Sequence, residues 1–104
     1  MSADYIYEGG VQIKFTAILH AENNAVTSSP VGLPSIPNEN FIKRVVLRVL
    51  GDTIYWTDDG SNPTSTHGFP LEKDETLVYD GHDLNLFKMI SASVSDVRVI
   101  YYGV

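Results

Sequence analysis

Residues 52–71, DTIYWTDDGSNPTSTHGFPL, hold the strongest indication of how this chain folds. Thr53 to Thr57 are β-branched or aromatic, which predicts a strand, with Ile54 and Trp56 sharing one face as core residues. A dense group of turn formers follows, because Asp-Gly and Asn-Pro favour tight turns and aspartates bond the local backbone. Gly68 to Leu71 then restart the sheet. A strand, a shaped loop and a second strand in close succession indicate an all-β protein.

Alternating patterns on both sides of this stretch predict further strands. Residues 11–19 alternate apolar and mostly polar side chains, as a half-buried strand does. Residues 41–50, FIKRVVLRVL, are rich in β-branched side chains and end at a glycine, which favours a strand over a helix. Shorter strands are predicted at residues 75–79, 85–91 and 97–102, with a helix-like alternative for the second.

Two segments are predicted to lie outside these strands. Residues 1–10 form an extended N-terminal arm in this interpretation. Residues 21–40 contain three prolines and predict a long Pro-rich loop. A loop of this length is unusual in a small domain, so we expect it to pack against the body of the domain or a neighbouring subunit. The prediction is one domain over residues 11–104, an antiparallel, jelly-roll-like β-sandwich.

Composition narrows the functional classes. The chain has 104 residues, which suits one domain, and no cysteine, so disulfides and thiolate sites are ruled out. The formal net charge of −6 argues against a nucleic-acid partner, which needs clustered basic residues. No apolar run approaches the ~20 residues of a membrane helix, and the N-terminus lacks the pattern of a signal peptide. We therefore expect neither nucleic-acid nor membrane binding.

The residues that could carry chemistry are dispersed. His20, His67 and His82 do not stand at the spacings of a metal-binding strand, which argues against a metal-dependent jelly-roll enzyme. Residues 58–62 offer oxygen ligands for calcium but lack the EF-hand spacing. The acidic residues of 72–75 read as an exposed turn, without the cleft that glycoside hydrolysis needs. The sequence predicts a non-enzymatic protein with no catalytic residue, cofactor or metal.

Binding residues are predicted in two groups. Apolar and tyrosine side chains of the arm, the Pro-rich loop and the last strand form a candidate partner interface: Tyr5, Tyr7, Val31, Leu33, Ile36 and Tyr102. Tyr102 is taken to point outward because it follows Tyr101 in a strand, although the rings could equally fill the core. Polar residues of the central loop form a candidate contact loop: Asp58, Asp59, Asn62 and His67.

Three segments carry a family resemblance. They are residues 31–37 (VGLPSIP), residues 55–64 (YWTDDGSNPT) continuing to 68–71 (GFPL), and residues 97–102 (VRVIYY). Together they resemble small β-proteins encoded among the virion structural genes of tailed bacteriophages. In that family a strand leads into a W/R-x-D-D-G-x-x-P-T turn, a Gly-x-x-Leu restart and a last strand with paired tyrosines. The similarity covers roughly residues 31–102 and includes no catalytic signature.

The resemblance implies a structural protein of the virion, assembled in the host cytoplasm. The expected role is a capsid decoration or cement protein that binds the major capsid protein or other virion proteins. Such a protein binds the lattice in many copies, so that contacts which are modest for each copy add up to firm attachment. A homo-oligomer, with a trimer favoured, would suit three-fold positions. The alternative is a carbohydrate- or receptor-binding module of a phage head or tail fibre, which the aromatic residues and the contact loop would serve.

Overall fold

The structure, a computed structural model, describes residues 5–8, 11–14, 16–38, 41–80 and 83–103, and within these ranges it consists of strands joined by loops, with very little helix. The elements in chain order are β1 (Tyr5–Glu8), β2 (Val11–Lys14), β3 (Thr16–Val26), β4 (Ile42–Val49), β5 (Ile54–Thr57), β6 (Phe69–Leu71), β7 (Thr76–Tyr79), the 3₁₀ helix η2 (Leu84–Leu86), β8 (Lys88–Ser91) and β9 (Ser95–Gly103).

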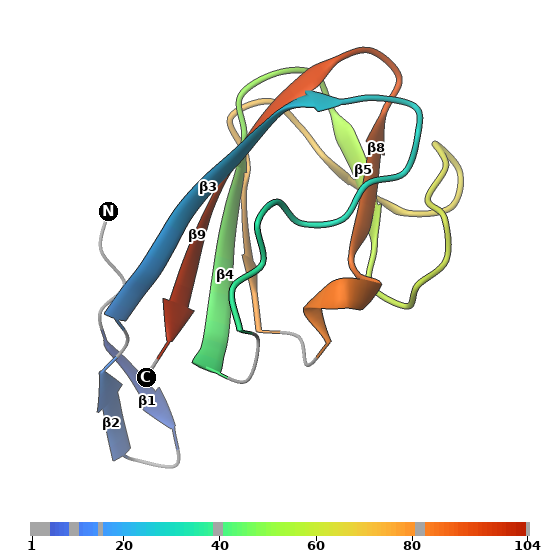
Figure 1. Cartoon of the computed structure of the whole chain (residues 1–104). Coiled ribbons are helices and arrows are strands. Elements are labelled where there is room, and N and C mark those ends of the chain that lie inside the picture. The colour runs from blue at the N-terminus through green and yellow to red at the C-terminus, as the bar shows by residue number, and fades with distance from the viewer. Residues whose placement is uncertain (1–4, 9–10, 15, 39–40, 81–82, 104) are drawn as a thin grey trace.

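The strands form two main antiparallel sheets and a hairpin. One sheet has four strands in the order β3-β9-β4-β7, and the other has three in the order β6-β5-β8. The pair β1-β2 forms a separate hairpin, which Figure 1 shows beyond the end of the larger sheet. The predicted all-β, antiparallel, sandwich-like architecture is confirmed. The jelly-roll connectivity stays a prediction.

Strand alternation places the core between the two sheets. In β4, Val45, Leu47 and Val49 are buried while the residues between them are at least partly exposed, and β9 alternates in the same way from Ser95 to Tyr101. The smaller sheet contributes Ile54 and Met89, both fully buried. Because β9 lies between β3 and β4, its inward residues form the centre of this core.

The first part of the predicted Pro-rich loop is strand. The single strand predicted at 11–19 was wrong, because these residues belong to two strands: β2, which pairs with β1, and β3, which pairs with β9. β3 continues to Val26, so the loop predicted at 21–40 begins too early. Residues 19–23 pair in register with residues 97–101 of β9. This backbone pairing outweighs the low strand propensity of Glu22, Asn23 and Asn24.

The remaining loop packs on the chain's own core. Val31 and Met89 exchange backbone hydrogen bonds, with N···O distances of 3.1 and 2.8 Å. Leu33 is only 7% exposed, and the Tyr101 hydroxyl donates to the Pro34 carbonyl oxygen at 2.5 Å. The loop was expected to pack against the body of the domain or a neighbouring subunit, and in the structure it packs against the body of the domain.

Two further predictions differ in detail. The extended arm predicted at residues 1–10 is a hairpin strand at Tyr5–Glu8, while residues 1–4 and 9–10 lie outside the described part of the chain. The strand predicted at 85–91 begins only at Lys88, after η2. Asp83 caps this helix, because its carboxylate accepts a hydrogen bond from the Asn85 N–H at 3.1 Å. The helix-like alternative therefore describes the first residues of the segment predicted at 85–91.

Candidate functional site

The side of the four-stranded sheet that faces away from the core is here called the outer face. It carries two shallow hollows. The larger, of about 430 Å³, is lined by His20, Ala21, Glu22, Arg98, Val99 and Ile100. The smaller, of about 220 Å³, is lined by Val46, Arg48, Thr76, Arg98, Ile100 and Tyr102. Arg98 and Ile100 line both, so the two hollows are neighbours on the sheet.

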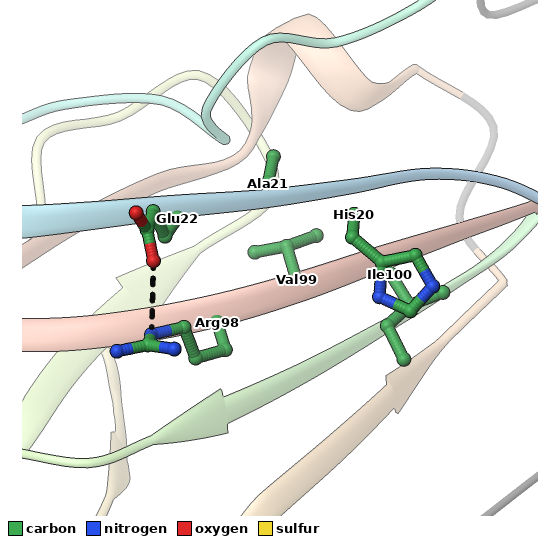
Figure 2. Close-up of a pocket in the computed structure, with 6 residues that line it drawn as sticks. All are labelled: His20, Ala21, Glu22, Arg98, Val99 and Ile100. Atoms are coloured by element: carbon green, nitrogen blue, oxygen red, sulfur yellow. Dashed lines mark ion pairs between the residues drawn. The ribbon is translucent and has the colours of Figure 1, made fainter.

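Strand register arranges the outer face in rows. One row across the four strands holds His20, Ile100, Val46 and Val78, and it is apolar apart from the histidine. The next row holds Glu22, Arg98, Arg48 and Thr76. Figure 2 shows Glu22 facing Arg98 across β3 and β9, with His20 and Ile100 further along the same strands. An apolar band thus lies beside a band of charges.

The charged band holds two arginines directly opposite each other. Arg48 and Arg98 are cross-strand partners, an arrangement that like charges disfavour. Arg98 lies 3.3 Å from Glu22 and 3.6 Å from Asp96, and Arg48 lies 3.9 Å from Asp74. These acidic neighbours offset the repulsion. Both arginine side chains remain 52% exposed, so their guanidinium groups are within reach of a partner.

The predicted partner interface does not assemble as one surface. Tyr102 lies on the outer face, where Ala17 and Arg44 are its cross-strand neighbours, but it is only 4% exposed and offers little contact area. Val31, Leu33 and Ile36 pack on the core instead. The side chains of Tyr5 and Tyr7 lie outside the described part of the structure.

The contact loop between β5 and β6 is held by its own hydrogen bonds. The Asp59 carboxylate accepts from the backbone N–H of Ser61 at 3.0 Å and from its hydroxyl. These bonds hold the pKa of Asp59 below its usual value, with the side-chain bond as the largest cause. The Thr57 hydroxyl donates to the Ser61 carbonyl oxygen at 2.7 Å. The loop is therefore an ordered, exposed structure.

The polar groups of this loop do not form a nucleophile. His67 Nε2 lies 3.0 Å from the Ser61 hydroxyl oxygen. Because that hydroxyl donates its proton to Asp59, His67 acts as the donor to it. An activated serine needs the opposite direction, in which the histidine accepts the hydroxyl proton. These hydrogen bonds instead stabilise the conformation of the turn.

A third hollow, of about 290 Å³, lies beside the contact loop. Asp58, Asp59 and His67 line it together with Phe69, whose side chain is 68% exposed. Asn62, the fourth predicted residue, lies elsewhere and accepts a hydrogen bond from Lys88 Nζ at 3.3 Å. Sequence reasoning missed Phe69. Alternation gave no signal for it, because Phe69 and the buried Leu71 are two residues apart and lie on the same side of the short strand β6, opposite Trp56 and Ile54 of β5.

Trp56 lies between the core and Phe69, which lines this hollow. It packs against the core cluster, and its ring stacks on Phe87 with centroids 5.3 Å apart and an interplanar angle of 12°. The Phe69 ring lies 5.5 Å away, at 37°. The predicted role of Trp56 as a core residue is confirmed, although part of its side chain remains exposed.

Within the described ranges, no three His, Cys, Asp or Glu residues gather closely enough to hold a metal ion. That part of the chain also contains no helix of the length and hydropathy needed to cross a membrane. Comparison of the chain with protein-family models, with curated proteins and with solved structures gives no match. Function is therefore argued from the outer face and from the hollow beside the contact loop.

Proposed function

We propose that this protein is a structural component of a tailed-phage virion, a decoration protein that binds the major capsid lattice through its outer face. The observation that supports this role is the apolar row of the outer face, flanked by two half-exposed arginines. An apolar centre with a charged surround, enriched in arginine, is typical of protein–protein interfaces. The virion itself is proposed from the resemblance of the three sequence segments.

Val78 is the clearest contact residue of this surface. It is 50% exposed at the end of the row that begins with His20 and continues through Ile100 and Val46. Burying such a side chain against a partner is favourable, and a lattice multiplies modest contacts through many copies. The acidic net charge would favour approach to a capsid with basic regions, while Arg48 and Arg98 would pair with acidic groups at the contact itself.

The test replaces Val78 with aspartate and measures binding to particles that lack the protein, by co-sedimentation and quantitative imaging. A buried, unpaired carboxylate at the contact should reduce the apparent affinity by about tenfold or more. Phe69→Ala is the control, because Phe69 is also an exposed apolar residue, at 68% against 50% for Val78, but lies on the other sheet. Thermal unfolding checks that both variants fold. Equal binding of Val78→Asp and wild type would contradict the proposal.

A second candidate function, a carbohydrate- or receptor-binding module, is favoured by the hollow beside the contact loop. An exposed aromatic ring next to carboxylates suits a sugar, whose apolar face stacks on the ring while its hydroxyls donate to the acids. On a glycan array or on host cells, Phe69→Ala should then abolish binding and Val78→Asp should retain it. The two variants therefore give opposite results under the two functions.

A further inference from the structure

Strand β3 is an unusually open sheet edge. The other edge strands of the two sheets are short, with three residues in β6 and four in β7 and β8, and β6 also contains Pro70. Short length and proline are two common ways of protecting an edge. β3 has 11 residues and contains no Lys, Arg or Pro. Its outer backbone groups are thus available to pair with another strand.

The regular part of β3 is centred on one residue. The pairing of β3 with β9 shifts between Ala17 and Leu19 and again between Asn23 and Val26. Between these irregularities, residues 19–23 keep a continuous register. The centre of that segment is Ala21, a small residue that allows close approach of another backbone.

Because His20 and Glu22 lie on either side of Ala21, the edge of β3 is complementary to the same edge of a second copy. When two copies of an antiparallel strand are related by a two-fold axis at Ala21, residue 20 of each faces residue 22 of the other. His20 would therefore lie opposite the second copy's Glu22, and the pair would occur twice. A histidine ring N–H can donate to a carboxylate in either tautomer. Glu22 would then lie between that histidine and Arg98 of its own chain, 3.3 Å away.

We propose that the protein forms a two-fold dimer in which the β3 strands of two copies pair antiparallel about Ala21, joining the two four-stranded sheets into one. The proposal does not depend on the proposed virion function. Pairing of one edge with itself closes after two copies, so this interface gives a dimer and not the trimer expected from the sequence.

The test is sedimentation velocity from the low micromolar to the submillimolar range. His20→Glu places two like-charged pairs across the axis and should weaken dimerisation by about tenfold or more. His20→Lys places opposite charges across the axis and should still dimerise. Thr76→Glu adds the same charge on the opposite edge strand and should leave the dimer intact. Wild-type protein that stays monomeric, forms a trimer, or dimerises as strongly as His20→Glu overturns the proposal.

Hydrogen exchange supplies a readout that needs no variant. Those amides of residues 19–23 that point away from β9 should become more protected as the protein concentration rises, and those of β7 should not. Protection that is independent of concentration in a sample shown to dimerise would place the interface elsewhere. Val78→Asp lies on β7 and should leave the dimer unchanged. Loss of lattice binding and loss of dimerisation are therefore distinguishable.

Discussion

At the scale of single residues, Trp56 joins the core to the exposed hollow. It touches the rings of Phe69, Tyr79 and Phe87, with centroid distances of 5.3 to 6.1 Å. Replacing Trp56 with alanine should lower the free energy of unfolding by about 3 kcal/mol, the low end for a large aromatic, because the ring is only partly buried. Urea denaturation followed by circular dichroism measures this change. Trp56→Phe should lose much less, and equal losses for the two variants would show that the ring contacts contribute little.

Tyr101 should make stability fall at high pH. Its buried hydroxyl donates to the Pro34 carbonyl oxygen, and burial raises the pKa of Tyr101 above its usual value of about 10. The folded protein therefore holds this proton more tightly than the unfolded chain, so the stabilisation is complete below about pH 10 and is lost as pH rises further. Tyr101→Phe should cost about 1 kcal/mol at neutral pH and should lose less stability than wild type between about pH 9 and 11. If wild type and Tyr101→Phe lost the same amount of stability at alkaline pH, this assignment would be contradicted.

Sequence patterns predicted inward residues better than exposed ones. Ile54 was placed correctly because alternation groups the residues that share one side of a strand. Tyr102 was predicted to be exposed, but its flanking strands cover it. Phe69 was not singled out, since whether an aromatic ring is covered depends on residues distant in sequence.

At the scale of elements, the Arg44–Asp80 pair fastens the edge strand β7 to β4. Two N–H groups of Arg44 donate to the two Asp80 oxygens at 2.8 Å, and the side-chain hydrogen bond with Arg44 is the largest cause of the lowered pKa of Asp80. This stabilisation is present above the usual aspartate pKa of about 4 and is lost as pH falls below it. Because Asp80 is half exposed, Asp80→Asn should cost only about 1 kcal/mol at neutral pH.

Thermal unfolding at two pH values measures that effect. Near neutral pH the variant should melt at a lower temperature than wild type, and near pH 3 the two melting temperatures should converge. Added salt should narrow the neutral-pH difference, because the pair is exposed enough to be screened. A difference that persists unchanged at acid pH would mean that the ion pair is not its cause.

The length of β3 could not be predicted from its own residues. Its second half, with Glu22, Asn23 and Asn24, has the composition of a loop, yet Glu22 and Asn23 pair with β9. That pairing depends on a strand near the other end of the chain, which local patterns do not reveal. The strand at 41–50 was predicted closely because its β-branched content and its buried face agree.

At the scale of the whole molecule, the sequence predicted the class of fold but not the order of the strands. Turn signals and alternation are local, whereas the arrangement β3-β9-β4-β7 is set by contacts between distant segments. The contact loop was predicted as a unit, and three of its four residues do line one hollow. The outer face could not be predicted, because its rows combine residues from four strands.

The central position of β9 also bears on how the chain reaches this structure. β3 and β4 do not pair with each other and are joined only through β9, which follows every other strand in the sequence. During synthesis the larger sheet therefore cannot be completed before β9 emerges from the ribosome, and until then β4 can pair only with β7 while β3 has no partner in this sheet. Folding that depends on such distant contacts is slow. Mutual repulsion between acidic nascent chains would help to keep β3 and β4 from aggregating before β9 is made.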